Sequence, residues 1–268
     1  AIQGDKDDKK NINYLVGVLS YIYQVRKSNK TRTNTITNLG KKPQKKEIDS
    51  ILDADERMYR DVLVFKNFIT NAKPLIICEG KTDITYLRSA LLSLSNKHRS
   101  LIEKKEIKVD FLRITATIQE LFKISGGTGD IGNLISNYSS YCDHFKRFTP
   151  ASPVIILIDN DSGAAPLRSL IKEITKTPFT RETEYAHIIN NLYIIQTPLI
   201  DGKDSAIEDL FESKTLNTKL EGKTFVYNKA NFDTKKHYGK NHFAEYVIRQ
   251  SRKDINFNGF NPLFESVK

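Results

Sequence analysis

The sequence predicts an α/β protein in which a parallel sheet is flanked by helices and preceded by an N-terminal helical segment. From residue 74 onward, short apolar runs alternate with stretches of helical periodicity, which is the pattern of successive β-α-β units. The run Val154–Ile158 is apolar throughout, as expected of a central strand covered on both faces. Acidic residues directly follow two of the runs, at the edge where parallel sheets bind ligands.

Length and charge narrow the classes of function. The chain has 268 residues, of which 39% are hydrophobic, so it can bury a sizeable core. It carries 42 Lys and Arg against 32 Asp and Glu, a formal net charge of +10, which predicts a polyanionic partner. No run approaches the ~20 apolar residues that span a bilayer, and no signal peptide is visible. We therefore expect a cytoplasmic protein that binds nucleic acid and no membrane. The cysteines Cys78 and Cys142 form no CxxC pair and fit buried thiols in a reducing compartment.

Two helical patterns and a basic segment precede the sheet. Apolar residues at helical spacing predict one helix over residues 11–25 and another over residues 47–70, which the proline at 74 limits. Between them, residues 27–46 hold seven Lys and Arg and no acid, which is typical of a linker or a basic arm. We expect this arm to contact phosphates through Lys41, Lys42, Lys45 and Lys46. These elements form a first region, residues 1–73.

The sheet region is predicted at residues 74–212 and a basic extension at residues 213–268. The expected strands are residues 75–78, 107–114, 154–158 and 192–196, and the expected helices between them are residues 83–94, 130–145 and 164–174. Because each helix can return the chain to the same edge, consecutive strands are expected to run parallel.

Four acidic residues lie at the ends of two predicted strands. Glu79 and Asp83 follow the first strand, and Asp159 and Asp161 follow the run at 154–158. If these strands are neighbours, the carboxylates converge, and like charges at close range require protonation or a neutralising cation. Oxygen ligands favour Mg²⁺ or Mn²⁺, which can stabilise phosphodiester chemistry. The alternative is that each acid only caps a helix.

Three motifs in order resemble the TOPRIM domain of topoisomerases, bacterial primases, small ribonucleases and OLD nucleases. They are EGKTD at 79–83, a glycine loop at 126–129 and DND at 159–161, each after a predicted strand or helical stretch. The resemblance implies a Rossmann-like fold over residues 74–212. It also implies that Glu79 is the general acid/base, that Glu79, Asp159 and Asp161 hold the metal, and that Asp83 supports them.

Two later residues resemble features of the OLD-type nucleases. The segment 207–211, with the sequence IEDLF, is similar to their later acidic motif, which implies that Glu208 is a ligand of a second metal ion. Lys240 opens a helical pattern over residues 241–250 and resembles the late lysine of that group. This similarity implies a catalytic role for Lys240.

The N-terminal part resembles a different enzyme. Residues 13–25 are similar to a helix in the thumb of bacterial reverse transcriptases. A thumb, a basic linker and an EGKTD TOPRIM domain in this order resemble retron reverse transcriptases with a fused C-terminal effector. The start at Ala1 instead of Met agrees with such a C-terminal part. The sequence has no YxDD motif, so any RNA-directed DNA polymerase activity would belong to residues outside it.

The basic extension has a pattern of its own. Residues 214–253 carry ten Lys and Arg against three acids, with aromatic residues interleaved. Such a mixture suits phosphate contact with base stacking, although a solvated helical face over a small core is the alternative. Lys235 and Lys236 are the candidate nucleic-acid contacts here.

The resemblance implies a magnesium-dependent nuclease that acts in anti-phage defence and is restrained by the retron RNA and its reverse-transcribed DNA. Cellular RNA is favoured over DNA as the substrate, because cleaving RNA would stop translation quickly. The rival interpretation is a non-catalytic TOPRIM module that binds the RNA–DNA product. A topoisomerase or primase is disfavoured, since neither a tyrosine domain nor zinc-binding cysteines can be recognised, and the glycine loop lacks the GK[ST] ending of an ATPase. The N-terminal helices could mediate assembly into a homo-oligomer.

Overall fold

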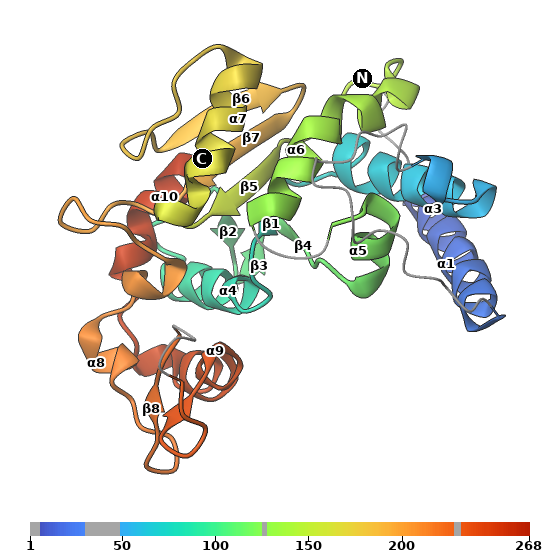
Figure 1. The fold of residues 1–268 in the computed structure, drawn as a ribbon. Coiled ribbons are helices and arrows are strands. Elements are labelled where there is room, and N and C mark those ends of the chain that lie inside the picture. The colour runs from blue at the N-terminus through green and yellow to red at the C-terminus, as the bar shows by residue number, and fades with distance from the viewer. Residues whose placement is uncertain (1–5, 30–48, 125–127, 228–231) are drawn as a thin grey trace.

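A five-stranded sheet forms the centre of the computed structural model, which describes residues 6–29, 49–124, 128–227 and 232–268 (Figure 1). The strand order is β4-β1-β5-β7-β6. Its strands are β1 (Leu75–Cys78), β4 (Asp110–Leu112), β5 (Val154–Ile158), β6 (Tyr185–Ile189) and β7 (Leu192–Gln196). The first four in the order run parallel, and β6 pairs antiparallel with β7 at the edge. The predicted class, a mixed α/β fold with a mostly parallel sheet flanked by helices, is confirmed.

Both faces of the sheet are covered, which explains the wholly apolar strands. Ile77 and Ile156 pack into one hydrophobic core, whereas Ile76 and Ile155 pack into a second core. Successive side chains of a strand point to opposite faces. Every residue of β1 and β5 is therefore buried only because helices lie on each side.

Most of the first face is covered by helices that precede β6 in the chain. They are α1 (Lys6–Asn29), α3 (Ala54–Val64), the π-helix η1 (Phe65–Ile69), α5 (Ala116–Phe122), α6 (Thr128–Cys142) and α7 (Ala165–Thr175). Asp53 caps α3, because its carboxylate accepts a hydrogen bond from the Glu56 backbone N–H at 3.0 Å while Glu56 accepts one from the Asp53 N–H. The Tyr23 and Tyr59 rings, 5.9 Å apart, join α1 to this layer.

The second face is covered by α4 (Asp83–Ser93) together with the C-terminal extension. The extension contains α8 (Ser213–Leu216), β8 (Thr224–Phe225), β9 (His237–Tyr238), α9 (Lys240–His242), the π-helix η6 (Phe243–Arg249), η7 (Arg252–Asp254), η8 (Asn258–Phe260) and α10 (Asn261–Val267). Figure 1 shows α8, α9 and β8 standing away from the sheet, while α10 returns toward it. The stacked rings of Phe225 and Phe243, 4.0 Å apart, hold β8 to η6.

The structure differs from the expectation at two strands. The strand predicted over residues 107–114 is shorter: a hairpin of β2 (Ile102–Glu103) and β3 (Glu106–Ile107) precedes β4. Lys104 and Lys105 form its turn with φ of 47° and 69°, the left-handed conformation of a two-residue hairpin loop. The antiparallel strand β6 was not predicted. The expected regions 1–73, 74–212 and 213–268 stay predictions.

None of the described helices combines the length and the apolar character needed to cross a membrane.

Candidate functional site

The carboxyl ends of β1 and β5 bring the first predicted acids together. The two strands are parallel neighbours, with Cys78 opposite Leu157, so Glu79 and Asp159 follow at the same edge of the sheet. The backbone of Asp159 lies near enough to the Glu79 carboxylate to lower its pKa. The condition for convergence, that the two strands be adjacent, is met.

Asp83 is fixed to the turn that follows β1. Its Oδ2 accepts a hydrogen bond from the Gly80 backbone N–H at 2.8 Å, and the side chain is buried. A Cβ atom at position 80 would lie 2.7 Å from Asp83 Oδ1, closer than any side chain tolerates. The glycine of the EGKTD motif therefore permits the carboxylate to approach the backbone.

The acids after β5 also accept backbone hydrogen bonds. Asp159 Oδ1 accepts from the Ile207 N–H at 2.9 Å, which ties the end of β5 to the short 3-10 helix η4 (Ile207–Leu210). Asp161 Oδ1 accepts from the Ala164 N–H at 3.2 Å and caps the turn before α7. The helix-capping alternative thus describes part of what Asp161 does.

Glu208 lies on η4 and is fully buried. Its Oε2 accepts a hydrogen bond from Lys240 Nζ at 3.0 Å, with the lysine side chain 38% exposed. Its Oε1 is buried without a hydrogen-bond partner among the described residues. A buried carboxylate oxygen without a hydrogen bond costs folding free energy. Its lone pair is available to a cation.

Burial and mutual repulsion link the five predicted acids. Burial raises the pKa of Asp159 to about 7, and the charges of Asp83, Glu208 and Glu79 add to this rise. Burial, followed by the charge of Glu208, raises the pKa of Asp83 to about 6. Burial and the charge of Asp161 raise the pKa of Glu79. The structure thus brings these residues into one electrostatic cluster, called the acidic site below.

Lys240 is the positive member of the acidic site. Burial lowers its pKa, but the nearby Glu208, Asp159 and Asp83 carboxylates outweigh that effect, so the pKa of Lys240 is raised. Its ammonium group also lies 5.7 Å from the centre of the Tyr227 ring. Lys240 therefore stays charged over the working pH range.

The donor set suits a divalent cation, although it is not preassembled. Within the described ranges, no group of three or more Asp, Glu, His or Cys side chains could hold a metal ion as it stands. Glu208 Oε1, which has no hydrogen-bond partner among the described residues, nevertheless leaves an oxygen donor available at the acidic site. Glu79, Asp159, Asp161 and Glu208 would hold Mg²⁺ or Mn²⁺ through oxygen after their side chains turn toward a common point.

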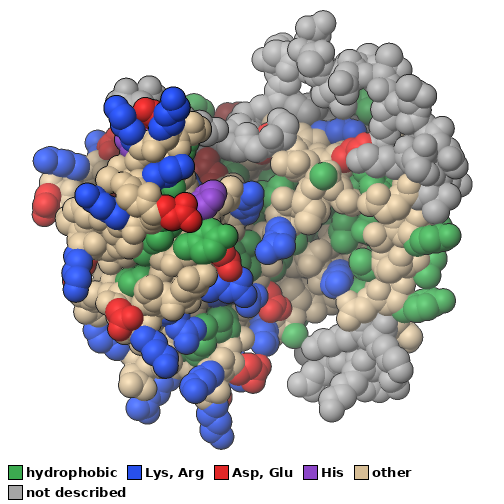
Figure 2. All heavy atoms as spheres, turned by 90° about the horizontal axis from the view of Figure 1, so that it is seen from below, with side chains coloured by type: hydrophobic (Ala, Val, Ile, Leu, Met, Phe, Trp, Pro, Cys, Tyr) green, Lys and Arg blue, Asp and Glu red, His purple; other side chains and the backbone are tan. Residues whose placement is uncertain are grey.

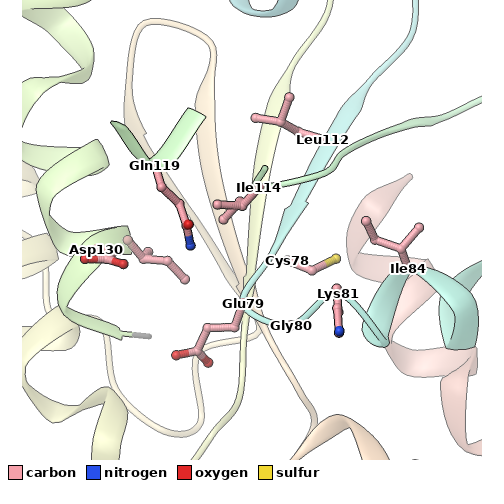
Figure 3. Close-up of a pocket in the computed structure, with 10 residues that line it drawn as sticks. Cys78, Glu79, Gly80, Lys81, Ile84, Leu112, Ile114, Gln119 and Asp130 are labelled. Carbon is pink, nitrogen blue, oxygen red and sulfur yellow. The ribbon is translucent and has the colours of Figure 1, made fainter. Parts of the chain in front are cut away.

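A pocket of about 200 Å³ opens beside Glu79 (Figure 3). Its apolar lining includes Ile84, Leu112, Ile114 and Ile131. Gln119 from α5 and Asp130 from α6 lie on the side away from α4. Glu79 therefore lines a cavity whose facing walls come from α4 and from α5 and α6.

Other predicted site residues lie apart or outside the description. Lys235 and Lys236 are exposed in the turn before β9. Lys41, Lys42, Lys45 and Lys46 lie outside the described residues, as do Gly126 and Gly127 of the glycine loop.

Sequence analysis missed two residues that hold the site. The Arg168 guanidinium donates to the Asp161 carbonyl at 3.0 Å and to Asn160 Oδ1 at 2.6 Å, so it fixes the DND turn. Tyr227 donates to Asp209 Oδ1 at 2.7 Å. Arg168 could have been found from sequence, because it is a basic residue one turn into the helix that follows the acidic loop. No sequence pattern indicates the contact of Tyr227, since that contact depends on how the extension folds back.

No family model and no solved structure matches this chain. What the acidic site does is therefore argued from the chemistry of its residues.

Proposed function

We propose that the protein is a Mg²⁺-dependent phosphodiesterase of the TOPRIM class that cleaves nucleic acid. The observation that carries the proposal is the pairing of Glu208 with Lys240 beside Glu79 and Asp159, at the carboxyl edge of two adjacent parallel strands. Ligands bind at this edge in open α/β sheets. The formal net charge of +10 favours a polyanionic substrate.

The residues divide the work of hydrolysis. A water oxygen attacks phosphorus, its proton passes to a base, the ester P–O bond breaks, and the leaving oxygen takes up a proton. Glu79 is half-buried with a raised pKa, which favours a role in accepting and returning a proton. The Lys240 ammonium can stabilise charge that develops on phosphate oxygens. Bound Mg²⁺ supplies Lewis-acid stabilisation of those oxygens.

A non-catalytic module that only grips nucleic acid is the rival proposal. Such a module gains nothing from Glu208, which is fully buried and only half-satisfied, or from an Asp159 whose pKa is raised to about 7. Both features cost folding free energy. A functional need for clustered carboxylates accounts for that cost, so cleavage is the better explanation.

The wider assignment rests on the similarity of residues 13–25 to a reverse-transcriptase thumb. In this assignment, the chain is the effector part of a retron reverse transcriptase in anti-phage defence. The retron RNA and its DNA copy restrain the nuclease, and cellular RNA is the favoured substrate.

The decisive assay incubates the purified chain with labelled tRNA, mRNA and DNA, with and without Mg²⁺. We expect Mg²⁺-dependent fragments from the wild type and none from the double variant Asp159→Asn, Asp161→Asn. Asn keeps both backbone hydrogen bonds through its Oδ1, so the variant should fold. Asp143→Asn, at an exposed position, is the matched control and should cleave normally. Full activity of the double variant would refute the metal site.

A further inference from the structure

A second concave feature lies in the C-terminal extension. It is a groove of about 580 Å³ between the β8–β9 pair and η6. Residues of its wall include Leu220, Phe232, His237, Gly239, His242 and Tyr246. We call it the aromatic groove. None of these residues belongs to the acidic site.

The rings of the groove are exposed to solvent. Phe232 is 40% and Tyr246 49% exposed, although aromatic side chains of this size are usually buried. His242 and Tyr246 lie one helical turn apart, with ring centres 5.6 Å apart and planes inclined by 35°. The Phe232 and His237 ring centres are 6.0 Å apart. Two ring pairs thus offer faces to a flat, unsaturated ligand.

The surroundings of the groove carry a small excess of positive charge. Lys223 and Glu221 both line it, and Lys235 and Lys236 are exposed in the adjoining turn, which also holds Asp233. Figure 2, which views the molecule from the side of α8, α9 and β8, shows Lys and Arg side chains over much of this face, with hydrophobic side chains between them. A nucleotide is a ligand that is both anionic and aromatic.

The groove and the acidic site share one short segment. Gly239 lines the groove, and the next residue, Lys240, pairs with Glu208. His242, two residues further, lines the groove again. The segment that carries the positive residue of the acidic site therefore also forms part of the groove wall.

We infer that the aromatic groove binds an unpaired nucleotide of the substrate strand, in RNA or DNA, beside the phosphate that is cleaved. In a duplex the base faces are already stacked, so they cannot stack on Phe232 and Tyr246. This inference rests on the proposed function and names its substrate class: single strands or unpaired segments.

The test measures binding without cleavage, in the Asp159→Asn, Asp161→Asn background with fluorescein-labelled 12-nucleotide RNA, DNA and a blunt duplex. We expect Phe232→Ala and Tyr246→Ala each to weaken single-strand binding about 5- to 100-fold, the range for losing one stacked base. Duplex binding should change less than twofold. Tyr246→Phe, which keeps the ring, should retain single-strand affinity. Tyr185→Ala, at a tyrosine 58% exposed on β6, is the matched control.

A loss of single-strand affinity in the Ala variants, for RNA, for DNA or for both, supports the inference and identifies which kind of strand is bound. Unchanged single-strand affinity, or an equal loss for the duplex, overturns it. Mg²⁺-dependent cleavage of the labelled single strands by the chain with wild-type Asp159 and Asp161, at saturating substrate, reports on the acidic site. If no hydrolysis occurs in any variant while ring-dependent binding persists, the proposed nuclease fails and the groove stands.

Discussion

Lys240 Nζ lies 3.0 Å from Glu208 Oε2, although 32 positions separate the two residues. The carboxylate is completely buried and the ammonium is not. This pair joins the C-terminal extension to the carboxyl edge of the sheet. It also means that the lysine occupies one oxygen of a proposed metal ligand.

Replacing Lys240 should separate catalysis from metal affinity. We expect Lys240→Ala to lower the cleavage rate ~10²–10³-fold, the effect of losing one preorganised charged donor. Because the substitution frees Glu208 Oε2 and removes a competing cation, half-maximal activity should require less Mg²⁺. A magnesium titration of the residual rate measures both effects. Lys235→Ala and Lys236→Ala are controls. Equal losses in all three variants would show that Lys240 only contributes to a binding surface.

Asp159→Asn should stabilise the metal-free protein in a pH-dependent way. An aspartate titrates near pH ~3.9 in an unfolded chain, whereas the pKa of Asp159 is raised to about 7 in the fold. Between these values the folded state keeps a proton that the unfolded state has released, so the free energy of unfolding falls as pH rises. Asn cannot lose a proton. The variant should therefore melt above the wild type near pH ~8 and together with it near pH ~4.

Thermal scans with and without Mg²⁺ measure this effect. Adding Mg²⁺ should stabilise the wild type and narrow the gap. Asp143→Asn, at an exposed position, should show no gap at either pH. If the gap between Asp159→Asn and wild type does not grow with pH, the Asp159 carboxylate carries no penalty in the fold.

Gly259→Ala should weaken the support of Glu208. A Cβ at position 259 would lie 2.2 Å from the Leu210 carbonyl oxygen, so η8 must move away from η4, which carries Glu208. Overpacking of this kind costs about 1–3 kcal/mol, and urea unfolding measures it. Gly17→Ala on α1, where a Cβ meets nothing within 4 Å, is the control and should be neutral or slightly stabilising. Equal stability of the two variants would contradict the close packing of η8 on η4.

The basic arm should contribute to binding without sequence preference. Neutralising Lys41, Lys42, Lys45 and Lys46 to Gln should reduce the log–log salt slope of nucleic-acid binding by up to ~3–4 units. A filter-binding series over salt concentration gives the slope. An unchanged slope would show that the arm links the two regions and does not contact nucleic acid.

The sequence was sufficient for the strands that are buried on both faces. The segment Val154–Ile158 contains no polar residue, so it was predicted as a strand covered on both faces. In the structure it is β5, and the acids that follow it lie at the carboxyl edge of the sheet. The edge strand β6 was not predicted, because Tyr185 and His187 are exposed and the alternation of apolar and polar residues is incomplete. The hydrogen bonds of Arg168 to the DND turn could not be derived, since they depend on the tertiary packing of α7.

The resemblance selected Glu208, but residue spacing alone could not separate it from its neighbour Asp209. In the structure Glu208 is fully enclosed, whereas Asp209 accepts a hydrogen bond from Tyr227 near the surface. That difference arises from the extension folding back over η4. Sequence spacing contains no such information.

Three site carboxylates each accept a backbone N–H as well: Asp83 from Gly80, Asp159 from Ile207 and Asp161 from Ala164. An amide oxygen can accept the same hydrogen bond but carries no charge. Descendants of this protein that abandon cleavage yet keep the fold should therefore drift toward Asn at these positions and avoid Ala. Inactive copies would then be recognisable in a genome by amides at three loop-anchoring positions.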